Sequence, residues 1–360
     1  MHSVFQSLVR RLLPPALALA ASCALAAPTY DVKVIAPPEP SGDIDMFWYT
    51  AIDLNNDGKS LVNLYQYMNP YSGYQTFDKH GNKLGLPQTE TPPSHGASFV
   101  GLNNWGDVIG SMTHSNWIWM GTVLKVGGYE AEVHGLPGDI YGGYFSDAYA
   151  YDANDVGQVV GQATSSTDGR KRAYLWQDKV MTEIGTFGGP SSSAAAINRG
   201  GVVVGSADRA DGTTHAFAYR NGRLHDLGTL GGSNSSASKI NNKGQIVGTA
   251  QQPDGVERAF IYSDRVMKAL PTPEGASASA RSINRGGFAI GSYRLDGQYH
   301  SFLYDGVAVH RINDLIDQTG QQRPWTIESA SAINDKGWVL CNGRRAGDKH
   351  ATVLLLKPRP

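Results

Sequence analysis

A short pattern of apolar and polar positions recurs seven times along the chain: an apolar residue, Asn, two variable residues, Gly, and then a mostly apolar run. The asparagines are Asn55, Asn103, Asn154, Asn198, Asn241, Asn284 and Asn334, and successive ones lie 48, 51, 44, 43, 43 and 50 residues apart. A nearly fixed period of this length is typical of repeat architectures. Each repeat therefore predicts one structural unit.

The repeat around Asn241 predicts four short β-strands. Apolar and polar residues alternate over 237–240, and the following Asn-x-x-Gly segment is typical of a tight turn. Runs rich in β-branched and aromatic residues then follow, separated by Gly- and Asp-containing turns. They cover residues 245–249, 258–262 and 265–270. No helical periodicity competes with this pattern after the N-terminal segment.

A four-stranded sheet in every 45 or so residues is the blade of a β-propeller. We therefore expect an all-β fold, a seven-bladed β-propeller of four-stranded antiparallel blades, with residues 27–360 as a single domain. The seventh repeat ends after its third strand, which is expected near His350–Leu356. Residues Tyr30–Ile35 resemble the fourth strand of the other repeats. They are predicted to complete the last blade and so to close the ring.

Several phrases resemble the HAF-repeat family of predicted extracellular bacterial proteins, which is β-propeller-like. The triplet His215-Ala216-Phe217 gives this family its name, and the companion phrases are 226–232 and 240–248. The resemblance is strongest from about Ala148 to Tyr304. It implies export and a propeller-like fold, and it implies no established catalytic activity.

The first 26 residues are expected to be a signal peptide. Arg10 and Arg11 precede an apolar stretch over 12–26, and Ala24-Leu25-Ala26 suits cleavage after Ala26. This predicts a secreted or periplasmic bacterial protein with no membrane span, because the apolar stretch is short and contains two prolines. Attachment through a lipid anchor at Cys23 and export by a twin-arginine route are the alternatives.

Charge and cysteine content narrow the expected partners. The chain carries 31 Lys and Arg against 32 Asp and Glu, so no basic stripe is available for phosphate groups and nucleic acid is not an expected partner. Only Cys23 and Cys341 are present, so a mature chain would hold one thiol. Cys341 replaces the Gly found in sister repeats and is interpreted as a buried structural residue.

Local sequence motifs give little support for a catalytic site, a metal site or a cofactor site. Asp53–Gly58 matches the start of a calcium loop, but Leu64 stands where a bidentate carboxylate is needed, so a hairpin turn is favoured. His215, His300 and His350 occupy equivalent places, where sister repeats carry Arg. A structural hydrogen-bonding role is therefore expected for them. No hydrolase, metalloprotease or dinucleotide motif is present, and no cofactor is expected.

The candidate ligand-binding surface is a rim of long aromatic loops that lead into the first strands of blades one, two, three and seven. Exposed aromatic rings with a few polar groups suit a sugar, peptide or protein surface. The alternative is that these rings only pack the loops onto the ring. The candidate residues are Trp48, His95, Trp117, His134, Tyr141, Tyr144, Asp147 and Trp325.

Three functions remain open from the sequence. The first is a non-enzymatic binding or surface-interaction module whose partner is an unknown glycan, peptide or protein at the cell surface. The second is a polysaccharide-directed hydrolase or lyase, with His95, His134 and Asp147 as acid/base groups. The third is a structural spacer without a ligand. The absence of a catalytic motif favours a protein that is not an enzyme.

Overall fold

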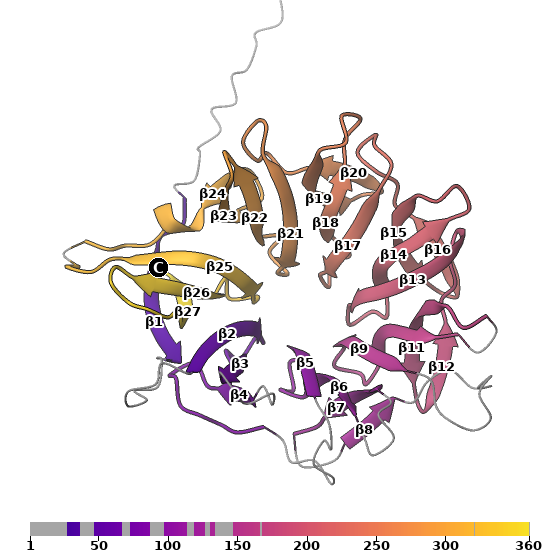
Figure 1. The fold of residues 1–360 in the computed structure, drawn as a ribbon, viewed down its shortest axis with the longest axis horizontal. Helices are drawn as coiled ribbons and strands as arrows, with labels where there is room; N and C mark the ends of the chain where they lie inside the picture. Colours follow the sequence, from indigo (N-terminus) through magenta and orange to yellow (C-terminus); the bar gives the residue numbers. More distant parts are fainter. Residues whose placement is uncertain are drawn as a thin grey trace, which may run out of the picture.

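The computed structural model describes residues 27–36, 47–66, 73–86, 97–113, 119–126, 130–133, 147–165, 168–319 and 321–359. Seven antiparallel sheets stand around a central axis and form a closed ring, as Figure 1 shows. The predicted seven-bladed β-propeller is therefore confirmed.

Blades are numbered one to seven in chain order, and the strands of each blade run outward from the axis. Blade one holds β2 (Phe47–Leu54), β3 (Ser60–Gln66) and β4 (Gly73–Phe77), three strands within the described residues. Blade two holds β5 (Ala97–Leu102), β6 (Val108–Thr113), β7 (Trp119–Leu124) and β8 (Glu130–Val133). Blade three holds β9 (Ala148–Ala153), β10 (Val159–Thr164), β11 (Lys171–Gln177) and β12 (Val180–Glu183).

The later blades repeat the same order. Blade four holds β13 (Gly188–Ile197), β14 (Val203–Arg209), β15 (Thr214–Arg220) and β16 (Arg223–Asp226). Blade five holds β17 (Ser235–Ile240), β18 (Ile246–Gln251), β19 (Glu257–Ser263) and β20 (Val266–Ala269). Blade six holds β21 (Ser277–Ile283), β22 (Ala289–Leu295), β23 (Gln298–Tyr304) and β24 (Val309–Arg311), followed by the 3-10 helix η1 (Ile312–Asp314).

Blade seven joins the two ends of the chain. Its strands are β25 (Trp325–Ile333), β26 (Val339–Arg345), β27 (Thr352–Pro358) and, outermost, β1 (Tyr30–Ala36). β1 pairs antiparallel with β27, and Tyr30 lies opposite Pro358. In Figure 1 the first and last strands lie side by side. Closure by the N-terminal strand is therefore confirmed, with the strand one residue longer than predicted.

The hydrophobic core lies between neighbouring blades. One cluster joins Val160 and Ala173 of blade three to Ala194 and Phe217 of blade four, and equivalent clusters occupy the other junctions. A four-stranded sheet exposes two faces, and each face is covered here by the adjacent blade. Small residues recur on the inner strands because the sheets approach closely near the axis.

A recurring glycine marks a close approach inside most blades. Gly205 on β14 lies opposite Phe217 on β15, and a β-bulge in β13 follows its partner Ala194. A Cβ on Gly205 would overlap the Ser193 carbonyl oxygen and stand 3.0 Å from the Phe217 ring. The same Gly–Phe pairing occurs at Gly248 and Gly291. The glycine is therefore required by the bulge and by the aromatic ring that lies over it.

Blade seven has no glycine at this position. Cys341 takes the glycine position and lies opposite Leu354, so no aromatic ring covers it. Its inner strand β25 carries two register irregularities, as does β13 of blade four, whereas β17 and β21 each carry one. Cys341 is buried, and burial raises the pKa of its thiol. The expectation of a buried structural cysteine is confirmed.

Candidate functional site

The seven repeated asparagines end the innermost strands and form a ring of amides around one end of the central channel. The side-chain oxygen of each asparagine accepts at least one backbone N–H group of its own turn. The Asn241 Oδ1, for example, accepts the N–H groups of Lys243 and Gln245, both at 3.0 Å. The Asn241 Nδ2 then donates to the Asn284 carbonyl of the next blade at 2.9 Å. Asn241 thus serves a turn and a blade junction together.

This inter-blade hydrogen bond recurs around the ring. It joins Asn55 to Asn103, Asn154 to Asn198, Asn198 to Asn241, Asn241 to Asn284, Asn284 to Asn334, and Asn334 back to Asn55. The Asn103 amide instead donates to Asp107 in its own turn at 2.8 Å. The asparagines are buried. The predicted hairpin role of the repeat is confirmed, and the contact with the next blade is an additional role.

The residues that follow the asparagines form a second, outer ring at the channel mouth. They are Asn56, Asn104, Asp155, Arg199, Asn242, Arg285 and Asp335. At five of the seven places, the N–H of one member donates to the side-chain oxygen of the next member around the ring. Asn56 donates to Asn104 at 3.2 Å, Asn104 to Asp155 at 2.9 Å, and Arg199 to Asn242 at 2.9 Å. Arg285 likewise donates to Asp335, and Asp335 to Asn56.

Inside the mouth, the residue two positions before four of the asparagines lines the channel. Asp53 comes from blade one, Asp152 from blade three, Lys239 from blade five and Ser282 from blade six, and all line one cavity. The Lys239 Nζ lies 3.2 Å from the Asp152 Oδ2. Asp53 accepts the N–H of Leu102, and Asp152 that of Ile197, each from the next blade. These side chains therefore tie blades together across the channel.

The two carboxylates and the lysine influence one another electrostatically. Burial raises the pKa of Asp53, although Lys239 and two backbone N–H groups lower it. Burial opposes the charge of Lys239, yet the carboxylates of Asp152 and Asp53 raise its pKa overall. Lys239 therefore stays protonated and neutralises part of the negative charge in the channel.

Removal of the lysine charge should destabilise the ring. Lys239→Met leaves the Asp152 carboxylate, only 7 % exposed, without its cation. We expect a loss of about 2–3 kcal/mol at pH 7.5, less than for a fully buried pair because a third of the Lys239 side chain is accessible to water. Urea unfolding measures it, and Lys243→Met, on the exposed turn nearby, is the control.

The same variant should show a defined pH dependence. A carboxyl group whose pKa is higher in the folded state than in the unfolded state stabilises the fold below its unfolded pKa of 3.8. That contribution to the stability is lost as the pH rises through the folded-state pKa. Without the lysine, the pKa of Asp53 should rise further. The destabilisation by Lys239→Met should therefore be smaller at pH 5 than at pH 7.5. Equal losses at both pH values would contradict a carboxylate origin.

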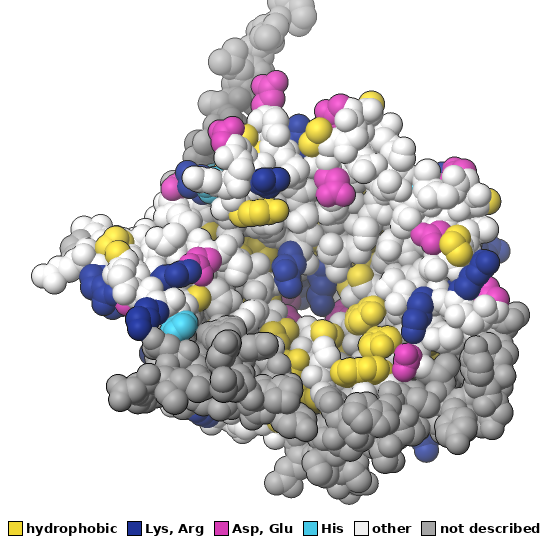
Figure 2. Space-filling view, in the orientation of Figure 1, with side chains coloured by type: hydrophobic (Ala, Val, Ile, Leu, Met, Phe, Trp, Pro, Cys, Tyr) yellow, Lys and Arg dark blue, Asp and Glu magenta, His cyan; other side chains and the backbone are white. Residues whose placement is uncertain are grey.

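The cavity at the mouth is small and polar. Its volume is about 140 Å³, whereas a pocket for a whole drug-sized ligand occupies roughly 300–1,000 Å³. In the space-filling view the ring is hollowed at its centre (Figure 2). The cavity has room for one polar end group of a larger molecule, while the remainder would lie on the face around it.

An exposed aromatic residue stands beside this mouth. Trp105 is 70 % exposed, and its indole N–H donates to the Asp155 carbonyl of the next blade at 2.9 Å. It borders a groove between blades two and three together with Val126, Val156 and Trp176. Both Val126 and Val156 are exposed. A fixed, exposed ring beside polar groups is suited to contact a sugar or peptide.

The structure does not describe the side chains of most of the predicted rim residues. His95, Trp117, His134, Tyr141 and Tyr144 lie outside the described residues, and for Trp48 the structure describes only its backbone, in β2. The rim loops lead into the innermost strands, and the asparagine ring ends those strands. The mouth therefore lies at the opposite end of the channel from the predicted rim.

The two remaining rim residues make intramolecular contacts. Trp325 is 6 % exposed in the core of blade seven, and the Arg345 guanidinium stands 4.4 Å from its ring centre. It follows the packing alternative left open by the sequence. Asp147 accepts the Trp119 N–H at 3.1 Å and lies 3.9 Å from the Lys171 Nζ.

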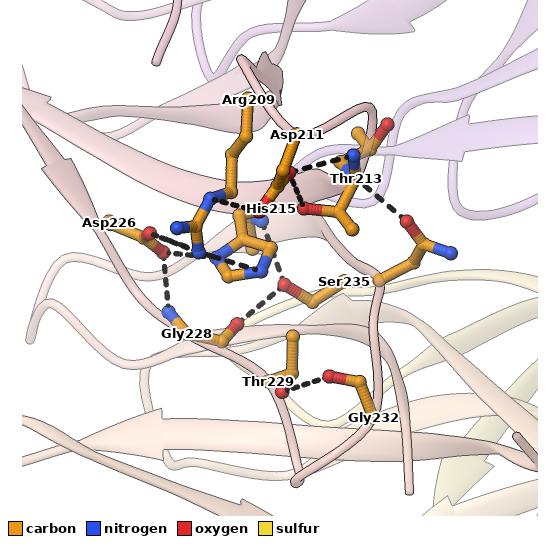
Figure 3. Close-up of polar contacts among 12 residues, drawn as sticks. Arg209, Asp211, Thr213, His215, Asp226, Gly228, Thr229, Gly232 and Ser235 are labelled. Atoms are coloured by element: carbon orange, nitrogen blue, oxygen red, sulfur yellow. Dashed lines mark hydrogen bonds and ion pairs between the residues drawn. The ribbon is translucent and has the colours of Figure 1, made fainter. Parts of the chain in front are cut away.

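The histidine of the His-Ala-Phe triplet has a structural hydrogen-bonding role, as expected. Figure 3 shows the His215 ring between Asp226 and Arg209. The His215 Nδ1 lies 2.8 Å from the Asp226 Oδ1, on the adjoining strand β16. At the equivalent place in blade three, Arg172 pairs with Glu183 at 3.2 Å. In these two blades, His or Arg at this position thus binds an acidic residue of the outermost strand.

Sequence reasoning missed the mouth residues that carry charge. The signal was present, because Asp53, Asp152, Lys239 and Ser282 are polar at a position where a first strand otherwise has small residues. Asp53 was interpreted only as part of a calcium-loop pattern. The described residues contain no cluster of His, Cys, Asp or Glu suited to a metal ion.

The chain matches no family model and no curated protein. Among solved structures, it resembles the β-propeller domain of the Trilobed protease from Pyrococcus furiosus, with a TM-score of 0.56 and 8% identity over 87% of this chain and 95% of that one. It also resembles the acylaminoacyl peptidase of Pyrococcus horikoshii, with a TM-score of 0.54 and 10% identity over 87% of this chain and 52% of that one. It therefore spans about half the length of that peptidase. These likenesses show the propeller fold alone.

No helix among the described residues is long and apolar enough to cross a membrane.

Proposed function

We propose that this propeller is an exported, non-enzymatic binding module of the HAF-repeat type, and that its ligand binds at the face around the channel mouth. Export and the family rest on the N-terminal segment and on the phrases around residues 215–217, 226–232 and 240–248. The observation that carries the binding role is the mouth itself. A polar cavity there is bordered by exposed charged side chains and by an exposed tryptophan.

The arrangement of carboxylates favours binding over catalysis. Asp53 and Asp152 both accept backbone N–H groups of the next blade, and Ser282 accepts one from Ile333 in the same way. Since a serine replaces the carboxylates in that contact, their common role is to join blades. Of the carboxylates considered for hydrolysis, Asp147 is occupied by Trp119 and Lys171.

Arrays of glycans and peptides should identify the ligand and its face. We expect binding by the wild-type chain and a loss of about tenfold or more in Trp105→Ala, because a buried aromatic contact at a binding hot spot contributes about 2 kcal/mol or more. Tyr299→Ala is the matched control, since Tyr299 is 72 % exposed and stands at the other end of the blades.

Trp48→Ala tests the aromatic rim as the competing surface. Loss of binding in Trp48→Ala with unchanged binding in Trp105→Ala would place the ligand at the rim and contradict a site at the mouth. The absence of any specific ligand on either array would contradict a binding module and favour the structural spacer.

A further inference from the structure

The hydrogen-bond acceptors at the channel mouth are already occupied by donors of the protein. Asp155 accepts the N–H and the side-chain amide of Asn104, and Asp335 accepts the Arg285 N–H and the Asn56 amide. Deeper in the channel, Asp53 accepts two backbone N–H groups, and Asp152 accepts one and pairs with Lys239. Each of the four mouth carboxylates is therefore already engaged by two donors of the protein.

The groups at the mouth that lack a hydrogen-bond partner within the described residues are donors. Their positions follow from the order of residues around the outer ring. Five of its members pass their N–H to an oxygen of the next member. The ring is interrupted where that next member is an arginine, because a guanidinium accepts no hydrogen bond. The N–H groups of Asp155, before Arg199, and of Asn242, before Arg285, thus have no acceptor within the described residues.

Within the described residues, the side chains of the two arginines in the outer ring also lack a partner. Arg199 and Arg285 line the mouth cavity and are exposed, and within the described residues neither guanidinium has an ion pair or hydrogen bond. They stand on blades four and six, on either side of Asn242 on blade five. One sector of the mouth therefore combines two guanidinium groups with a free backbone N–H between them.

We infer that this sector binds an oxyanion, the carboxylate or phosphate end group of the ligand, between the Arg285 guanidinium and the Asn242 N–H, with Arg199 on the other side. A guanidinium presents paired donors that match such a group in two hydrogen bonds, and hydrogen bonds between charged partners are the strong ones. The small cavity limits entry to an end group of this size. The inference names the chemistry of the ligand at the same mouth and so rests on the proposed binding role.

The test uses the full mature chain and inorganic phosphate as the probe. Titration followed by 1H–15N TROSY spectra should move the Asn242 amide resonance to saturation, and sodium chloride at equal ionic strength should not. Arg285→Gln should raise the phosphate dissociation constant about tenfold or more, because it removes a hydrogen bond to a charged group. Arg285→Lys should restore part of the affinity, and Arg223→Gln, an exposed arginine on the outer strand β16, is the control.

A parallel titration with acetate distinguishes a carboxylate from a phosphate ligand. The inference is wrong if chloride moves the Asn242 resonance as far as both oxyanions do, or if Arg285→Gln binds them like the wild type. An array ligand that binds Arg285→Gln unchanged would retain the binding module and reject the oxyanion sector. Saturable oxyanion binding in a chain that finds no array ligand would support the sector and contradict the proposed function.

Discussion

Deletion of residues 27–36 is expected to lower the melting temperature by about 7 °C. The deletion removes β1 and with it the buried side chains of Tyr30, Ile35 and Ala36, which pack in two core clusters. Two fully buried large side chains contribute roughly 2 kcal/mol each, and the partly buried Val32 and Val34 add to this. The loss of about 5 kcal/mol corresponds to about 7 °C in a chain of this size.

The deletion would also leave β27 as an exposed edge in blade seven. β27 carries the apolar run 353–356, and an unpaired apolar edge promotes aggregation. Differential scanning calorimetry measures the melting temperature, and light scattering follows association. Lys33→Ala, an exposed change on the same strand, is the control and should melt within a degree or two of the wild type. A deletion variant as stable as the wild type would contradict closure by β1.

Gly205→Ala is expected to destabilise the protein by about 3 kcal/mol or more. The added methyl group would overlap the Ser193 carbonyl oxygen and lie 2.9 Å from the Ala194 Cα, and both belong to the backbone of β13. The Phe217 ring, fully buried above the glycine, blocks movement in the other direction. Insertion into a packed core costs 1–3 kcal/mol, and a rigid neighbour gives the upper end or more.

The control for this change is Gly200→Ala in the same blade. Gly200 is exposed, and an added Cβ would meet only the Asn198 Oδ1, at 3.4 Å. Urea unfolding should give nearly the same free energy for this control as for the wild type. If Gly205→Ala were equally stable, the close approach of β13 and β14 would not be a requirement of the fold.

The repeated sequence phrases carried most of the information about the fold. The Asn-x-x-Gly turn predicted the end of each inner strand, and the alternation beyond it predicted the pairing inside each blade. Tyr30–Ile35 could be assigned to the last blade because the seventh repeat lacked its fourth strand. In blade one the repeat is weaker, and three strands are seen within its described residues. Membership of the HAF-repeat family stays a prediction.

The candidate site was much less predictable. The sequence drew attention to long aromatic loops, whereas the cavity lies at the other end of the channel, among short turns. Arg199 and Arg285 lie 86 residues apart in the sequence, and nothing local marks them as a pair. Their common feature is that each interrupts a ring of hydrogen bonds that only the closed structure forms.

The sequence by itself determined the number of blades, the position of the turns and the strand that closes the ring, because these follow from local periodicity and from pairing within one repeat. Only the tertiary structure decided which side chains meet at the axis and which donors remain unpaired there. Those contacts join residues of different repeats, and their geometry depends on the closure of all seven blades around one channel.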